Sequence, residues 1–288
     1  MDTMMDTEFL KNLGKFNLIV KKRITSNYKG GRRSLAHGRG ISLMDFRQYV
    51  PGDDIRTVDW KIFGRTDDLY IKRFEEERSL AVHIVVDQSA SMNFGGKKTK
   101  FDYSSMIGVG FAYLTMKENE RFEFSTFAED LNTIRARKGP HQLAYIVEYL
   151  NKAKVKGDSK FEQIMSKYKR MITSRSLIIV ISDFLFDLQE IEKGLACIGR
   201  RGKHDIKVIQ VLDKVESELD IEGDVQLHDA ESGNTLRTHI SPRLRKRYQY
   251  ELNRHSDKIH DMCRRLGLHY YFVTTDIPIF DAFFEILR

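Results

Sequence analysis

Three oxygen-bearing side chains on alternate residues, Asp87, Ser89 and Ser91, directly follow an apolar run of the chain. The run, residues 80–86, is rich in β-branched residues and predicts a strand buried on both faces of a parallel sheet. Ligands of open α/β sheets bind outside the carboxyl ends of the strands. One carboxylate and two hydroxyls at such an end predict a site for a hard divalent cation, with Mg²⁺ as first choice and Mn²⁺ or Ca²⁺ as alternatives.

The pattern Asp-x-Ser-x-Ser resembles the metal-ion-dependent adhesion site of von Willebrand factor A domains. That resemblance implies two further ligands, an Asp after a second buried strand and a Thr in a Gly-containing loop before a helix. Asp183 matches the first, because it follows the apolar run 176–181 and Ser182. In the loop that begins at Gly157, Ser159 stands where the Thr is expected, and Asp158 is the alternative ligand.

The motif has two other interpretations. A lone Asp-x-Ser-x-Ser also occurs as an ordinary loop or helix cap, since Asp and Ser are favoured there. The correct strand end, together with Ser-Asp after a second strand, favours the metal site. A phosphatase of the haloacid dehalogenase type needs a second Asp two residues after the first. Ser89 occupies that position, so the general acid of such an enzyme is missing.

The composition predicts a soluble, cytoplasmic protein with either one large core or one core and a smaller attached domain. Of 288 residues, 41% are hydrophobic, and no apolar run approaches the length of a membrane span. The N-terminus is acidic and lacks the apolar region of a signal peptide. The two cysteines, Cys197 and Cys263, are far apart and form no metal-binding pair, which fits a reducing compartment.

The net charge of +7 is concentrated in two basic stretches, residues 11–39 and 243–265. Basic surfaces attract nucleic acid, acidic lipid or acidic proteins. No recognised nucleic-acid motif accompanies these charges, so we interpret the later stretch as a solvated helix face and do not expect a nucleic-acid partner.

The chain separates into residues 1–78, which are polar and turn-rich, and residues 79–288, where apolar strands alternate with helical patterns. The second part predicts a doubly wound α/β fold with a mostly parallel sheet flanked by helices. Further strands are expected in the following ranges: 121–127, 206–212 and 269–273, with 131–137 pairing back as a hairpin. Residues 213–237 show no helical period and predict a small β excursion. A long helix is expected from about Pro242 to Leu266.

Residues 38–78 carry a longer and more specific signature. It contains Arg-x-Tyr-x-Pro-Gly-Asp-Asp from Arg47 and Arg-x-x-Asp-Trp-Lys from Arg56. These motifs, with residues 212–216 and 227–233, resemble the bacterial family catalogued as domain of unknown function 58. The resemblance implies a von Willebrand A-like domain with an N-terminal β extension. It also implies an adaptor or chaperone-like role beside a MoxR-type AAA+ ATPase in maturing an unknown client protein, with no catalytic reaction assigned.

Two functions follow from these patterns. The favoured one is a non-enzymatic, metal-dependent protein-interaction module. Gly95-Gly96-Lys97 lacks the spacing of a Walker A motif, so any ATP-driven work belongs to a partner. The alternative is a hydrolase that uses the same cation on phosphoesters, with Asp158 or Asp53 as base. Trp60, the single tryptophan, lies among mixed charges and is expected to pack the extension against the main domain.

Overall fold

The computed structural model describes residues 37–38, 42–75, 81–96, 98–137, 140–199, 204–221, 223–228 and 235–287. These residues belong to two compact units, with the boundary between Ser79 and Leu80. The larger unit contains the predicted cation ligands. Among the described residues, no helix is both long and apolar enough to cross a membrane.

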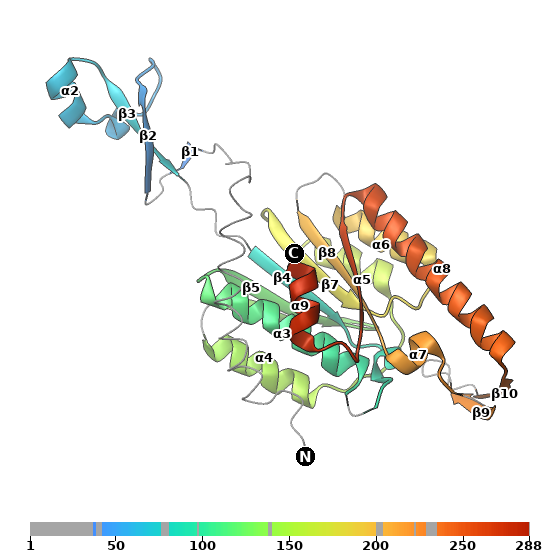
Figure 1. The fold of residues 1–288 in the computed structure, drawn as a ribbon. Helices are drawn as coiled ribbons and strands as arrows, with labels where there is room; N and C mark the ends of the chain where they lie inside the picture. Colours follow the sequence, from blue (N-terminus) through green and yellow to red (C-terminus); the bar gives the residue numbers. More distant parts are fainter. Residues whose placement is uncertain are drawn as a thin grey trace. The chain divides into compact units, whose positions relative to one another are not determined.

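The larger unit is built on a six-stranded sheet in the order β11-β8-β7-β4-β5-β6 (Figure 1). Its strands are β4 (Ala81–Asp87), β5 (Arg121–Phe127), β6 (Leu131–Arg137), β7 (Ser176–Ser182), β8 (Asp205–Leu212) and β11 (His269–Thr274). All neighbours pair in parallel except β5 and β6, which form an antiparallel hairpin at one edge. The buried apolar runs therefore form the parallel strands, and the hairpin at 131–137 is confirmed.

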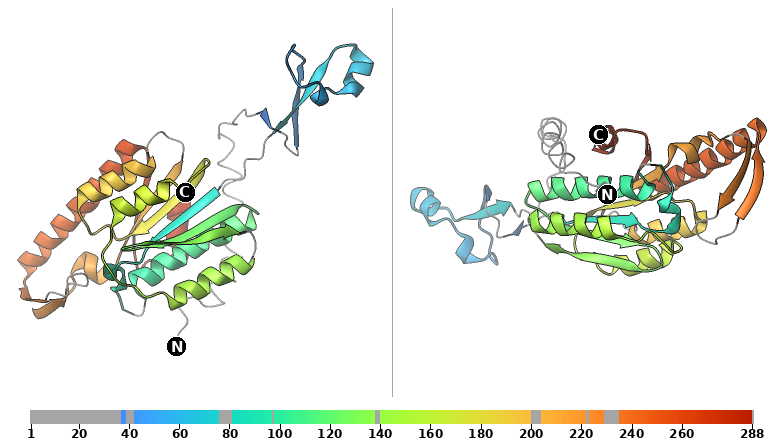
Figure 2. Two further views of the ribbon diagram at one scale, coloured as in Figure 1. Left: turned by 180° about the vertical axis from the view of Figure 1, so that it is seen from behind. Right: turned by 90° about the horizontal axis from the view of Figure 1, so that it is seen from below.

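Helices cover both faces of this sheet (Figure 2). One face carries α3 (Lys100–Lys117), α4 (Pro140–Lys152) and α9 (Ile279–Leu287). The other carries α5 (Phe161–Lys169), α6 (Leu188–Gly199) and α8 (Pro242–Leu266). Alternate side chains of β4 enter the two cores: Val82, Ile84 and Val86 point to one and Val85 to the other. The prediction of an α/β fold with a mostly parallel sheet between helices is confirmed.

The strand order places a topological switch beside β4. The chain passes from β4 through α3 to β5 on one side, and later returns through α5 to β7 on the other. Loops that leave two such strands in opposite directions open a crevice at their carboxyl ends, where ligands of open α/β sheets bind. Asp87 and Asp183 lie at these two strand ends.

Close packing of α3 depends on glycine. A Cβ added at Gly108 would come within 2.9 Å of the Phe124 ring and 3.2 Å of Ile84. Gly108 therefore lets α3 approach β4 and β5. Gly110 instead faces the ring of Phe283 on α9, which packs against the outer side of α3.

The β excursion is a separate antiparallel pair, β9 (Gly223–His228) with β10 (Thr235–Ile240). A short helix that the sequence pattern missed, α7 (Lys214–Glu218), precedes it. Asp213 caps this helix, because its Oδ1 accepts a hydrogen bond from the Val215 amide. Five residues are too few to produce a recognisable helical period.

The strand and helix patterns in the sequence place seven aromatic residues on inner faces, which predicts that they lie in the core. Five of them are buried: Phe122, Phe124, Phe127, Phe161 and Tyr168. Tyr271 is half-buried, and the prediction is wrong for Phe272, which is 41% exposed. Both lie on β11, an edge strand that neighbours cover less completely than the central ones.

The smaller unit contains a three-stranded antiparallel sheet in the order β1-β3-β2. Its elements are β1 (His37–Gly38), β2 (Ser42–Gln48), the 3₁₀ turn η2 (Ile55–Thr57), α2 (Trp60–Thr66) and β3 (Tyr70–Glu75). It is thus a β extension with one helix. Asp53 forms an ion pair with Arg47 at 2.8 Å, in keeping with a structural role for this charged patch.

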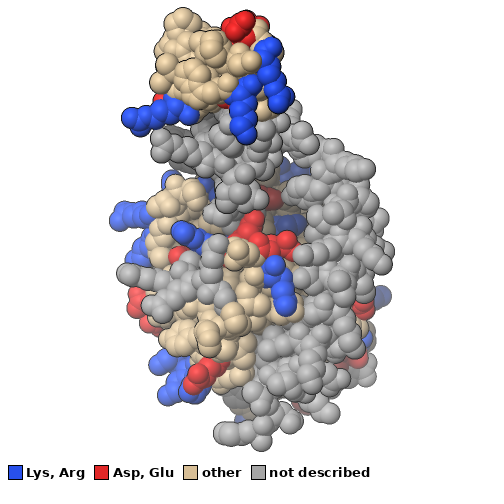
Figure 3. All heavy atoms as spheres, turned by 90° about the vertical axis from the view of Figure 1, so that its left-hand side faces the viewer, with Lys and Arg blue, Asp and Glu red and all other residues tan. Residues whose placement is uncertain are grey.

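Trp60 begins α2 and is 59% exposed, with its ring set edge-on against Phe63. It therefore contributes little to the core of its own unit. Figure 3 shows Lys and Arg side chains of this unit beside a broad area of uncharged residues. Large apolar side chains exposed in this unit are Phe46, Val50, Ile55 and Trp60.

Candidate functional site

Asp87 ends the central strand β4 and is fully buried. Its Oδ1 accepts a hydrogen bond from the Ser89 amide at 2.8 Å, and its Oδ2 accepts one from the Ser182 hydroxyl at 2.6 Å. The second contact follows from the register, because Val86 pairs with Ile181 and the next residues along the two parallel strands are Asp87 and Ser182. The carboxylate is therefore held from both sides before any ligand arrives.

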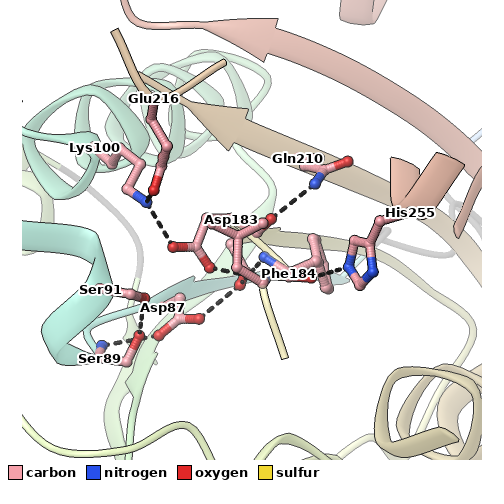
Figure 4. A network of polar contacts seen from close by, with 11 residues as sticks. Asp87, Ser89, Ser91, Lys100, Asp183, Phe184, Gln210, Glu216 and His255 are labelled. Carbon is pink, nitrogen blue, oxygen red and sulfur yellow. Dashed lines mark hydrogen bonds and ion pairs between the residues drawn. The ribbon is translucent and has the colours of Figure 1, made fainter. Parts of the chain in front are cut away.

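The two motif serines lie in the turn that follows. Ser89 is buried and precedes the 3₁₀ turn η3 (Ala90–Asn93), while Ser91 lies within that turn and is partly exposed. Their hydroxyl oxygens are 3.2 Å apart, and Figure 4 shows them beside Asp87. The tight turn brings both hydroxyls to the side of the carboxylate, as the alternating pattern predicts.

Asp183 follows β7 and is also buried. Its carbonyl accepts a hydrogen bond from the Gln210 side chain, and its Oδ1 accepts one from the Leu185 amide. The next residue, Phe184, has a φ of 52°, a left-handed conformation that is rare for a bulky side chain. The Phe184 carbonyl accepts a 2.7 Å hydrogen bond if His255 of α8 is protonated at Nε2. Such strain persists where surrounding contacts over-determine a loop, and it is concentrated at functional sites.

The predicted third loop also reaches this region. The Ala90 amide donates to the Gly157 carbonyl at 2.9 Å, and the Lys156 amide donates to the Gln88 carbonyl at 3.1 Å. These bonds join the loop to the turn that carries the motif serines. Two residues beyond Gly157, the Ser159 hydroxyl is buried and has no hydrogen-bond partner among the described residues. The neighbouring Asp158 is exposed.

A lysine that the sequence patterns did not single out completes the site. Lys100, the first residue of α3, is fully buried, and its ammonium donates to Asp183 Oδ2 at 2.8 Å. The same nitrogen lies 3.0 Å and 2.8 Å from the two carboxylate oxygens of Glu216 on α7. Figure 4 shows Lys100 between the two acids, on the opposite side of Asp183 from Asp87.

One sequence signal points to Lys100. A lysine in the first turn of a helix meets the positive end of the helix dipole and is unfavourable there without a compensating anion. Its position immediately after Thr99, which forms a capping box with Asp102, marks it as such a residue. The partner Glu216 lies on the unpredicted helix α7, and no local pattern connects the two.

Electrostatics at the site leave negative charge uncompensated. Burial, and to a smaller extent the charge of Asp183, raise the pKa of Asp87 to about 7. Burial would lower the pKa of Lys100, but the carboxylates of Asp183 and Glu216 hold it above its ordinary value. Lys100 pairs with two of the three carboxylates, Asp183 and Glu216, and when Asp87 is also ionised the formal charge of the four groups is −2.

The residues at this strand end fit a hard divalent cation. Carboxylate and hydroxyl oxygens are its preferred ligands, and the orphaned Ser159 hydroxyl and the charge of −2 both favour one. Within the described ranges, no cluster of three or more His, Cys, Asp or Glu side chains is arranged to hold a metal by itself. A cation would therefore depend on the hydroxyls as well as the acids.

Large apolar side chains are exposed close in sequence to the site residues, two of them in loops and one on α7. Phe94 follows η3 and is 44% exposed, and its ring centroid lies 5.8 Å from the Lys100 ammonium. Leu185, two residues after Asp183, is 37% exposed, and Val215, directly before Glu216, is 40% exposed. We call Phe94, Leu185 and Val215 the apolar rim.

Comparisons with known proteins give relatives in mycobacteria. The chain is 29% identical over 247 residues to an uncharacterised protein of Mycobacterium bovis and to one of Mycobacterium tuberculosis, a match that covers 83% of this chain and 76% of each relative. Among solved structures, it is similar to the conserved hypothetical protein BatB of Bacteroides thetaiotaomicron, with a TM-score of 0.49 at 15% identity over 72% of this chain and 97% of that one. An aerotolerance-related membrane protein of Bacteroides fragilis gives a TM-score of 0.44 at 16% identity, over 72% of this chain and 98% of that one.

The family comparison covers both units of the chain. The model described as "Protein of unknown function DUF58" matches residues 45–258, a span that includes most of the smaller unit and all five predicted cation ligands. The protein therefore belongs to the DUF58 family.

Proposed function

We propose that this protein is a non-enzymatic, divalent-cation-dependent protein-interaction module of the von Willebrand factor A type. The observation that carries the proposal is the combination of an anionic, hydroxyl-lined strand end with the apolar rim beside it. Exposed apolar side chains around a polar centre are typical of a surface that another protein covers. A small, hydrated phosphoester would gain little from them.

In this proposal Asp87, Ser89, Ser91, Ser159 and Asp183 hold the cation, with Mg²⁺ as the physiological choice. When bound, the cation supplies an open coordination position for a carboxylate of the partner. Ser182 and the Ser89 amide fix the Asp87 carboxylate, so that little side-chain order has to be gained on binding. Burial and the hydrogen bond from the Leu185 amide fix the Asp183 carboxylate, and the Gln210 side chain holds the Asp183 carbonyl.

The middle-loop ligand is assigned to Ser159 rather than Asp158. The Ser159 hydroxyl is buried without a partner among the described residues, and a buried polar atom in that state costs about 1–3 kcal/mol. Coordination would relieve this cost. Asp158 is exposed and solvated, so it loses more solvation on binding and relieves no such cost.

We propose a MoxR-type AAA+ ATPase as the partner and an adaptor role in the maturation of a client protein. The family resemblance suggests this partner, and the apolar rim suits a protein rather than a small molecule. The test is association of the purified chain with a MoxR-type ATPase from the same cell, measured by interferometry over a salt series with Mg²⁺ or with chelator. Binding should vanish with chelator and persist at moderate salt, because screening acts most strongly on exposed, separated charges.

Two variants sharpen this test. Asp87→Ala should abolish the association, whereas Asp130→Ala, which removes an exposed acid from the β5–β6 turn, should leave it unchanged. Association that collapses with salt but ignores chelator would refute the metal-bridge model. Turnover of phosphoesters that is lost in Asp87→Ala would instead make the protein a hydrolase.

A further inference from the structure

The Lys100 ammonium donates hydrogen bonds only to the carboxylates of Asp183 and Glu216 among the described residues. Its three protons face Asp183 Oδ2 and the two oxygens of Glu216, at 2.8, 3.0 and 2.8 Å. Lys100 and Asp183 are both buried from solvent, and Glu216 is largely shielded. The lysine therefore connects one proposed cation ligand to α7.

Lys100 stands at a position where a lysine is unfavourable by local rules. It lies in the first turn of an 18-residue helix, where the exposed amides favour anions. Burial adds the cost of removing an ammonium from water, which is compensated only when the charge is paired. Helical side chains point back toward the amino terminus, so this position directs the ammonium toward the strand ends. The pairing with two acids is the feature that offsets both costs.

The charge balance indicates how this ammonium affects cation binding. It occupies one oxygen of Asp183 and cancels one of the three negative charges on Asp87, Asp183 and Glu216. A positive charge fixed this close to a cation site opposes a second cation. Glu216 acts in the opposite sense, because it adds negative charge and draws the ammonium toward α7.

We propose that Lys100 is a resident counter-cation that lowers the affinity of the site for divalent ions and couples its occupancy to α7 through Glu216. The inference rests on the proposed function, since it concerns the same cation site. When a divalent cation binds to Asp183, Lys100 releases this carboxylate and its ammonium then pairs with Glu216 alone. The state of the site is thereby transmitted to α7 and to Val215 of the apolar rim.

Two substitutions should move the affinity in opposite directions. Lys100→Met keeps a long apolar stem and removes the charge, so Mn²⁺ should bind about tenfold more tightly or better. Glu216→Gln keeps the shape and removes a negative charge, so Mn²⁺ should bind about tenfold less tightly. A purely structural disturbance would weaken binding in both. Calorimetry with Mn²⁺ alone on the full chain measures the two constants, and circular dichroism checks the fold.

The coupling to α7 has its own readout. Hydrogen exchange of residues 213–219 should change on addition of Mn²⁺ to the wild type and should not change in Lys100→Met, in which the connection is cut. If Lys100→Met fails to fold, the weakening expected in Glu216→Gln still tests the proposal, since Glu216 is partly exposed and its substitution is milder.

The outcomes separate this inference from the proposed function. Loss of Mn²⁺ binding in Asp87→Ala, together with unchanged affinity in Lys100→Met and Glu216→Gln, would overturn the role of Lys100 and leave the cation site standing. Equal weakening in both variants would also overturn it. Absence of Mn²⁺ binding in the wild type and in Lys100→Met would overturn both proposals.

Discussion

The Ser182 hydroxyl donates to Asp87 Oδ2 at 2.6 Å and so connects the ends of the two central strands, β4 and β7. The Ser182 hydroxyl oxygen also accepts a hydrogen bond from the Phe184 amide at 2.9 Å, at the start of the strained loop. One small side chain thus holds a proposed cation ligand and the loop that carries the second acid. This is why the residue before Asp183, as well as Asp183 itself, determines the geometry of the site.

Replacement of Ser182 by alanine should destabilise the protein and weaken cation binding. The Phe184 amide loses its acceptor and the Asp87 carboxylate loses a donor, which together cost about 2–3 kcal/mol. Loss of this hydrogen bond also raises the pKa of Asp87 further, since the bond favours the charged form. Urea denaturation and Mn²⁺ calorimetry measure the two effects.

Ser176→Ala is the matched control. Ser176 is buried in the same strand, and its hydroxyl donates to the Ser174 carbonyl, at the opposite end of β7 from Asp87. It should cost about 1 kcal/mol and leave cation affinity unchanged. Equal loss of affinity in both serine variants would contradict the connection between Ser182 and the site.

The raised pKa of Asp87 predicts a pH dependence of the metal-free protein. The pKa rises from 3.8 to about 7 on folding, so the folded state holds this proton more tightly than the unfolded state. The stability from the protonated group is fully present below about pH 4 and is lost as the pH rises through about 7. Relative to Asp87→Asn, which cannot ionise, the wild type should lose about 4 kcal/mol between pH 4 and pH 8 in chelator.

Divalent cations supply the control for this experiment. Addition of Mg²⁺ at pH 8 should recover stability in the wild type and have no effect on Asp87→Asn. Parallel stability curves for the two proteins in chelator would show that Asp87 does not titrate in this window.

The middle-loop assignment predicts different effects for two neighbouring residues. Ser159→Ala removes the buried, unpartnered hydroxyl and should lower the Mn²⁺ affinity about tenfold, while it leaves stability unchanged or slightly higher. Asp158→Ala removes an exposed carboxylate and should change the affinity less than twofold. Calorimetry on both variants decides the ligand, and the reverse order would transfer the role to Asp158.

Much of the fold could be predicted because its signals are local. The apolar runs at 80–86 and 176–181 have the length and composition of buried parallel strands, and they form β4 and β7. Both ends of the helix from Pro242 to Leu266 could be predicted from adjacent residues, because Ser241 caps its start and Gly267 ends it with a φ of 71°. A serine before a helix and a glycine after it are recognisable in a sequence, and both help to satisfy the backbone hydrogen-bonding groups at helix ends.

The parts that were missed depend on contacts between distant residues. The role of Lys100 depends on its ion pairs with Asp183 and Glu216, which lie 83 and 116 residues further along the chain. That Trp60 packs the extension against the main domain stays a prediction, and within its own unit the indole is mainly exposed. The strand ends could therefore be located from sequence, but their charge balance could not.

The last prediction concerns the apolar rim. If a partner protein covers this surface, Phe94→Ala and Leu185→Ala should each weaken ATPase association about tenfold or more, because a truncated apolar anchor at the centre of an interface costs more than 1 kcal/mol. Neither side chain has a cation ligand atom, so Mn²⁺ affinity should remain within about twofold of the wild type. Tyr145→Ala is the matched control, since this residue is 57% exposed on α4 and lies outside the rim. Interferometry and calorimetry on the same preparations separate the two properties. Equal weakening by Tyr145→Ala, or unchanged association in both rim variants, would show that the partner does not contact this surface.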